Sequence, residues 1–114
     1  MAKETAEGGL AERYAHALFE LARDGGLVDV VSADLASLRR AMETSIDLRR
    51  LVRSPVFSAE DQAKALKALL EKMGATALTS KFVLLLAQKR RLRVLTQIIL
   101  AYEHLIAASR GETE

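Results

Sequence analysis

The fold is decided by the stretch Ala77-Leu78-Thr79-Ser80-Lys81-Phe82-Val83-Leu84-Leu85-Leu86-Ala87-Gln88-Lys89-Arg90. At about 100° per residue, the apolar side chains of this stretch occupy nearly every side of a helical wheel. A helix that is apolar almost all round is covered by other elements. Residues 77–90 therefore predict a helix that is either central to the fold or covered by something else.

Five more segments with helical periodicity surround this helix, at residues 10–24, 27–43, 46–53, 59–73 and 94–108. Gly25-Gly26, Ser54-Pro55 and Gly74 separate them, as expected of helix ends. No alternating apolar and polar run is long enough for a strand. We therefore predict an all-α, six-helix bundle in a single compact domain at residues 10–108, with successive helices nearly antiparallel. Residues 1–9 are expected to be frayed or disordered.

Composition narrows the class of protein. The chain has 114 residues, of which 50% are apolar and 28% charged, and this is typical of a globular domain. The absence of cysteine excludes disulfides, thiolate metal sites and a cysteine nucleophile. The longest apolar run, residues 82–87, is far shorter than the roughly 20 residues that span a membrane. The net charge of +2 is too small to indicate a partner.

The predicted helix at residues 10–24 also has an apolar face that is wider than a surface helix requires. Its apolar residues cover about 200° of the wheel, whereas a stripe a little over 100° wide is usual. One interpretation places helices 10–24 and 77–90 side by side, with a shared groove that accepts an amphipathic helix of a partner. Ala15, Ala17 and Ala22 would allow close approach, and the walls would be Leu18, Phe82, Leu85 and Leu86. The alternative is that helix 77–90 is the hub and that the extra alanine face of helix 10–24 is simply exposed.

No constellation for catalysis is apparent. His16 and His104 lie on different predicted helices without a local ligand partner, and no phosphate-binding glycine loop or metal motif occurs. Glu60 and Asp61 are adjacent, so they point about 100° apart and suit the start of a helix better than a carboxylate dyad. The sequence predicts a protein that is not an enzyme, with no catalytic residue, metal or cofactor.

The basic run from Lys89 to Arg93 supports an alternative function, a small helical nucleic-acid-binding module. Against it, no aromatic residues are interleaved for base stacking, and cations also suit the C-terminal end of a helix. A third interpretation is a domain that hides the apolar groove in a homodimer.

Three segments carry a resemblance to a known family. The first is Arg13-Tyr14-Ala15-x-Ala17-Leu18-Phe19-Glu20-Leu21-Ala22, and the second is Leu51-Val52-x-Ser54-Pro55-Val56-Phe57 with Lys64 downstream. The third is Phe82-Val83-x-Leu85-Leu86-Ala87-x-x-x-Arg91-Leu92, followed by Leu95, Ile98 and Tyr102. Together they resemble the N-terminal domain of the delta subunit of bacterial F-type ATP synthase, whose mitochondrial counterpart is the oligomycin-sensitivity-conferring protein. Lys89-Arg90 departs from the family, which often carries asparagine or glycine there.

The resemblance implies a stator function. In that family the N-terminal helix of an alpha subunit docks between the first and fifth helices, and the protein holds the catalytic head against rotor torque. Residues 109–114 would form the junction to a missing C-terminal domain that meets the b subunits of the peripheral stalk. The location implied is peripheral, on the cytoplasmic face of the bacterial inner membrane, without nucleic acid and without membrane insertion. The residues expected to bind the partner are Tyr14, Ala17, Leu18, Leu21, Phe82, Leu85, Leu86 and Lys89.

Overall fold

The computed structural model describes residues 6–111 of the chain, and within that range it contains α-helices, one 3-10 turn and no strand. The elements are α1 (Ala6–Asp24), α2 (Val28–Thr44), α3 (Ile46–Arg53), α4 (Ala59–Met73), α5 (Ala77–Gln88), η1 (Leu92–Val94) and α6 (Leu95–Gly111). The predicted all-α class is confirmed. No helix in this range is both long and apolar enough to span a lipid bilayer.

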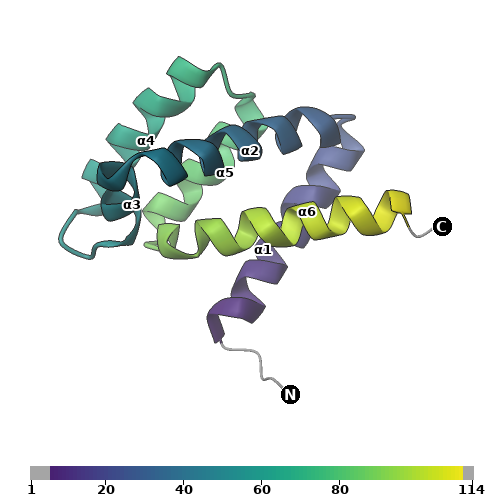
Figure 1. The fold of residues 1–114 in the computed structure, drawn as a ribbon, viewed down its shortest axis with the longest axis horizontal. Coiled ribbons are helices and arrows are strands. Elements are labelled where there is room, and N and C mark those ends of the chain that lie inside the picture. Colours follow the sequence, from purple (N-terminus) through teal and green to yellow (C-terminus); the bar gives the residue numbers. More distant parts are fainter. Residues whose placement is uncertain (1–5, 112–114) are drawn as a thin grey trace.

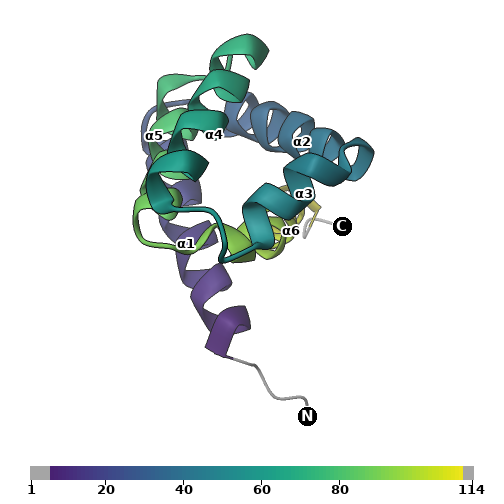
Figure 2. The ribbon, with the colours of Figure 1, turned by 90° about the vertical axis from the view of Figure 1, so that its left-hand side faces the viewer.

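The helices form two layers. In Figure 1, α2 crosses in front of α5 and α6 crosses in front of α1. The view turned by 90° places α1, α4 and α5 on one side and α2, α3 and α6 on the other (Figure 2). The two helices singled out by their broad apolar faces, α1 and α5, therefore lie in the same layer. This arrangement places their outer sides on one face of the molecule.

The close partners are not always neighbours in sequence. α4 packs mainly on α5, as expected for successive helices, but α1 packs mainly on α6. Ala11, Ala15 and Ala22 of α1 are buried in the core. Because the alanine side chain is small, the backbone of a neighbouring helix can approach α1 closely. The first and last helices of the chain thus pack against each other.

Several predicted helix ends are shifted. α1 begins at Ala6 and continues through Gly8-Gly9, four residues before the predicted start at residue 10, while residues 1–5 lie outside the described range. α5 ends at Gln88, because Arg90 has a left-handed φ of 59°. α6 continues to Gly111, and residues 112–114 lie outside the described range.

Side chains fix the starts of three helices. Ser45 Oγ accepts from the amide of Leu48 at 3.1 Å, and Ser58 Oγ accepts from the amide of Asp61 at 3.0 Å. These are ordinary N-caps. Asp34 of α2 reaches the start of α5, where its Oδ2 accepts from the amide of Thr76 at 2.9 Å. This contact fixes where α5 begins relative to the other layer.

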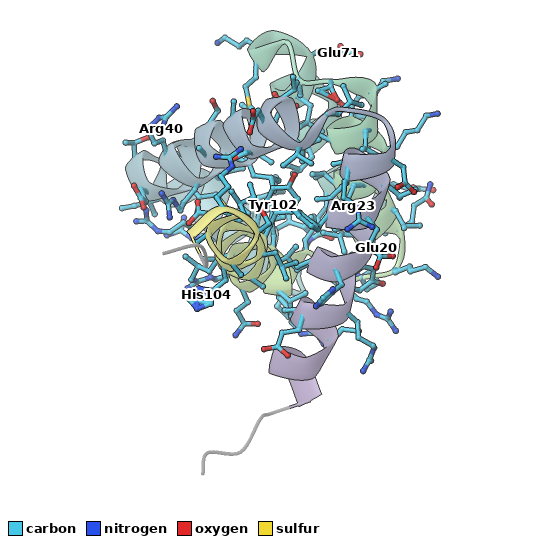
Figure 3. The ribbon with its side chains drawn as sticks, turned by 90° about the vertical axis from the view of Figure 1, so that its right-hand side faces the viewer. Glu20, Arg23, Arg40, Glu71, Tyr102 and His104 are labelled. Carbon is cyan, nitrogen blue, oxygen red and sulfur yellow. The ribbon has the colours of Figure 1, made fainter. Side chains whose placement is uncertain are left out.

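Tyr102 of α6 joins three helices at the centre of the bundle (Figure 3). Its hydroxyl donates to the carbonyl of Val28 at the start of α2, at 3.0 Å. Its ring lies 5.9 Å from the ring of Phe19 of α1, edge to face. Burial is the main cause that raises the pKa of Tyr102 to about 12, and the carboxylate of Asp29 adds to the rise while the nearby Arg110 opposes it.

Candidate partner-binding seam

The broad apolar face of α1 consists of two adjacent stripes, each with the 4-3-4 spacing of residues on one side of a helix. One stripe is fully buried in the core and contains Ala11, Ala15, Leu18 and Ala22. The other, one residue earlier at each position, is only partly covered and contains Leu10, Tyr14, Ala17 and Leu21. We call this second set the outer stripe of α1. The two stripes together explain why the wheel is apolar over about 200°.

α5 repeats this arrangement. Its buried stripe contains Thr79, Val83 and Leu86. The outer stripe of α5, again one residue earlier, contains Leu78, Phe82, Leu85 and Lys89. Phe82 is buried, Leu78 is half-buried, and Leu85 and Lys89 are exposed. We call the contact between α1 and α5, together with the two outer stripes, the α1–α5 seam. Leu21 remains 56% exposed and Leu85 39% exposed, so both helices present large apolar side chains to solvent.

Two aromatic rings mark the middle of the seam. The rings of Tyr14 and Phe82 lie 6.0 Å apart at 76°, an edge-to-face contact. Arg91, just after α5, donates from Nη1 to the hydroxyl of Tyr14 at 2.7 Å, and its Cζ lies 5.9 Å from the centre of the same ring. These contacts join the outer stripe of α1 to α5 and to the turn that follows it.

The structure divides the predicted site residues into two groups. Six lie on the outer stripes, namely Tyr14, Ala17, Leu21, Phe82, Leu85 and Lys89, but of these Phe82 is only 8% exposed and belongs to the buried core. The other two, Leu18 and Leu86, are 0% exposed and belong to the buried stripes, so the expectation that they wall a groove is corrected. The physical reason is that one residue along a helix is a rotation of about 100°, and a wheel with two neighbouring apolar sectors does not show which one faces inward.

Sequence reasoning omitted two members of the outer stripes and one residue that supports them. Leu10 and Leu78 complete the 4-3-4 pattern and are half-buried. The spacing was a signal that could have identified both. Arg91 was placed in the basic run and in the third segment of the resemblance, but no sequence pattern links it to Tyr14, 77 positions earlier.

The hollows described for this structure lie away from the seam. Five hollows of about 210 to 370 Å³ either border α3 or run along the contact of α1 with α6, and none of these five touches the seam. The open furrow expected between α1 and α5 is not among them. What the seam offers a partner is two apolar stripes on either side of an aromatic contact.

The two histidines lie away from the seam. His16 and His104 line a hollow of about 250 Å³ together with Glu12, and Figure 3 shows His104 on the outer side of α6. Within residues 6–111, no three acidic, histidine or cysteine side chains are grouped so that they could hold a metal ion.

Comparison with known proteins gives a consistent result. The family model described as ATP synthase delta (OSCP) subunit matches residues 10–114. The chain is 54% identical over 104 residues to the protein named ATP synthase subunit delta of Rhodopseudomonas palustris strain HaA2. It is 51% identical over 110 residues to the protein of the same name in Xanthobacter autotrophicus, and 50% identical over 110 residues to that of Azorhizobium caulinodans.

These alignments cover 91–96% of this chain but only 55–59% of each relative. The chain therefore spans a little more than half of the length of the relatives it matches.

Proposed function

This chain belongs to the ATP synthase delta (OSCP) subunit family, and we propose that it acts as a non-catalytic stator subunit of an F-type ATP synthase. In this proposal it links the catalytic head to the peripheral stalk and opposes rotor torque. Its place is peripheral, on the cytoplasmic face of a bacterial inner membrane. We also propose contact with b subunits of the stalk, without assigning it to residues of this bundle.

The head-binding surface we propose is the α1–α5 seam, and its ligand is the N-terminal amphipathic helix of an alpha subunit. The observation that carries this is the pair of outer stripes. Their 4-3-4 spacing matches the one-sided apolar face of a helix, which could lie between them with its axis along the seam. Leu21 and Leu85 are the exposed apolar anchors, and the Tyr14–Phe82 contact forms the floor.

Charge would set the direction in which the bound helix lies. Lys89 ends the outer stripe of α5 and is exposed. A lysine at one end of an apolar seam favours an acidic side chain or the C-terminal carbonyls of a bound helix at that end. A stable contact of ordinary size buries about 1,200–2,000 Å² in total, and most of its energy comes from a few apolar anchors.

Calorimetric titration of the 114-residue chain with a peptide of the alpha subunit's N-terminus tests the proposal. We expect binding at micromolar concentration with a negative heat-capacity change, because apolar surface is buried. Leu21→Asp and Leu85→Asp should each abolish measurable binding, since each places an unpaired carboxylate in the apolar contact. Val30→Asp is the matched control, because Val30 is exposed on α2, in the other layer.

Two results would contradict the proposal. One is no heat at concentrations up to about 100 μM with a folded chain, a range that a Kd in the micromolar range would make visible. The other is equal weakening by Val30→Asp and Leu21→Asp. Sedimentation without peptide should give a monomer, whereas a dimer that Leu21→Asp dissociates would assign the seam to self-association.

The alternative of nucleic-acid binding has weaker structural support. Arg90 hydrogen-bonds to Gln62 of α4 and to the carbonyl of Pro55, whereas Arg91 turns to Tyr14 of α1. The basic run from Lys89 to Arg93 is thus divided between two sides of the molecule. It does not form the continuous stripe that follows a phosphate backbone.

A further inference from the structure

The largest of the five hollows lies where α3 meets the end of α2 and the start of α6. Both ribbon views place these three elements together at one end of the bundle (Figures 1 and 2). The hollow has a volume of about 370 Å³ and is lined by Arg39, Met42, Glu43, Arg49, Val52, Arg53, Thr96 and Leu100. None of these residues belongs to the α1–α5 seam, so the two surfaces can be tested separately.

One side of this hollow is apolar. Met42 of α2 and Val52 of α3 are core residues, 5% and 4% exposed, and they also line the hollow. Leu100 of α6 is 50% exposed, whereas Ile98 and Ile99 just before it are fully buried. A single exposed leucine is ordinary on a protein surface. Leu100 differs because it shares a hollow with two core side chains, and together they form an apolar wall that a ligand could cover.

Arg53 supplies a charged group at the same hollow. It is exposed in the last turn of α3, and its side chain makes no hydrogen bond or ion pair with any residue in the range 6–111. A guanidinium presents parallel N–H donors that match the two oxygens of a carboxylate. Arg53 can therefore bind an anion here without first giving up a contact within the chain.

The other two arginines of the lining are held by the chain itself. Arg49 Nη1 donates to the carbonyl of Met42 at 2.6 Å and to that of Glu43 at 2.9 Å. Arg39 Nη1 donates to Glu103 Oε1 at 3.1 Å. Both guanidinium groups are thus compensated and fixed, and they act as rigid walls of the hollow.

One donor in these walls lacks a partner. The Nε of Arg39 is buried, lies 4.0 Å from Glu43 Oε2 and has no hydrogen-bond partner among the described residues. Because nearly all buried polar groups of proteins are hydrogen-bonded, an unpaired donor in the wall of a hollow indicates an acceptor that the chain does not supply. This observation points to a ligand with an oxygen acceptor.

The charge of the hollow limits the charge of its ligand. The three arginines of the lining face two carboxylates, that of Glu43 within the lining and that of Glu103 paired with Arg39. One net positive charge therefore remains. A monoanion would neutralise it, whereas a phosphate dianion would bring an excess of negative charge next to Glu43.

We propose that this hollow binds a small monocarboxylate with an apolar body. The carboxylate pairs with Arg53, and the apolar body packs on Met42, Val52 and Leu100. The volume lies at the lower end of the range of about 300–1,000 Å³ for small-molecule pockets, so the body is a short aliphatic chain or a single ring. The proposal does not depend on the seam or on the stator function.

The test is a titration of the full chain, labelled with ¹³C at methyl groups and with ¹⁵N, with sodium octanoate at constant ionic strength. We expect saturable shifts of the methyl groups of Met42, Val52 and Leu100 and of the Arg53 side-chain Nε–Hε resonance. Two matched probes separate charge from apolar surface. Acetate carries the carboxylate without the body, and octylammonium carries the body with the opposite charge, so neither should saturate the same resonances.

Two variants test the two parts of the site. Arg53→Gln should weaken octanoate binding at least about tenfold, because it removes a charge-assisted hydrogen bond without disturbing another contact. Arg40→Gln is its control, since Arg40 is exposed on α2 and lines none of the five hollows. Leu100→Ser should weaken binding at least about fivefold through lost apolar contact, and Val30→Ser is its control, because Val30 is 46% exposed outside the hollows.

Several results would overturn the proposal. One is the absence of saturation by about 20 mM octanoate, a concentration that nearly fills a site with a millimolar Kd. Another is saturation of the same resonances by acetate or octylammonium at equal concentration. A control variant that weakens binding as much as its partner would also contradict the site. Shifts confined to the methyl groups of Leu21 and Leu85 would place octanoate at the seam instead.

Discussion

Arg91 Nη1 donates a 2.7 Å hydrogen bond to the hydroxyl of Tyr14, which precedes it by 77 positions. The same guanidinium lies over the Tyr14 ring, and that ring packs edge to face on Phe82. One arginine just after α5 therefore holds an aromatic side chain of α1 in contact with α5. Because Tyr14 lies in the middle of the outer stripe of α1, this relationship fixes the geometry of the proposed partner surface.

Tyr14→Phe isolates the hydrogen bond from the packing. The ring of Tyr14 and its contact with Phe82 should remain, while Arg91 loses its acceptor. We expect a loss of about 1 kcal/mol in the free energy of unfolding, measured by urea denaturation with an unchanged m value. In a double-mutant cycle with Arg91→Gln, the two losses should not add, and full additivity would show that the bond contributes nothing.

Leu18 and Leu21 are three residues apart on α1 but should respond differently to truncation. Leu18 is fully buried, so Leu18→Ala should destabilise the fold by about 2–5 kcal/mol through lost burial and a cavity. Leu21 is 56% exposed, so Leu21→Ala should change the free energy of unfolding by less than about 1 kcal/mol. Chemical denaturation of the two variants checks this directly. Equal losses would mean that the outer stripe is part of the core.

The overall fold could be predicted because its signals are local. Helix periodicity, the glycines at residues 25, 26 and 74, and the serine caps at Ser45 and Ser58 depend only on nearby residues, and the structure places helices at those segments. The pairing of α1 with α6 is different. It depends on contacts between the two ends of the chain, and no pattern within either helix specifies its partner.

The sequence predicted which two helices form the candidate site, but it did not predict which side of each helix is exposed to a partner. The excess of apolar surface on α1 and α5 was visible on a helical wheel, and the outer stripes account for it. The wheel did not show that Leu18 and Leu86 are covered by the protein's own core, since coverage depends on which neighbours pack where. The 4-3-4 spacing of residues 10, 14, 17 and 21 parallels that of residues 78, 82, 85 and 89, and this match could have separated the two faces.

Arg90 allows a test of the backbone conformation in the turn after α5. Arg90→Gly and Arg90→Ala both remove the guanidinium and its bonds to Gln62 and Pro55, so the difference between them reports the backbone alone. Since the φ of 59° is easily adopted by glycine and is unfavourable for alanine, Arg90→Gly should be more stable than Arg90→Ala by about 1 kcal/mol. Thermal denaturation of both variants would show this. A more stable alanine variant would mean that the turn relaxes to another conformation when the arginine is lost.

Tyr102 should make the fold sensitive to alkaline pH. Its pKa is raised to about 12 in the folded chain, against 10.0 for an unperturbed tyrosine, because burial disfavours the charged phenolate and the carboxylate of Asp29 adds to the rise. Below pH 10 the phenol is neutral in both states, so its contribution to stability is complete. Between pH 10 and 12 the unfolded phenol ionises while the folded one stays neutral, and this favours unfolding by about 1.4 kcal/mol per pH unit.

The measurement compares the wild-type chain with Tyr102→Phe, because lysines and other groups also titrate in this range. At pH 7 the variant should be less stable by about 1–3 kcal/mol, since the carbonyl of Val28 loses its buried donor. As the pH rises above 10, the free energy of unfolding of the wild type should fall faster than that of the variant, and the gap should close or reverse by pH 12. Parallel curves for the two proteins would contradict the raised pKa, because they would mean that the phenol ionises equally readily in the folded and unfolded chains.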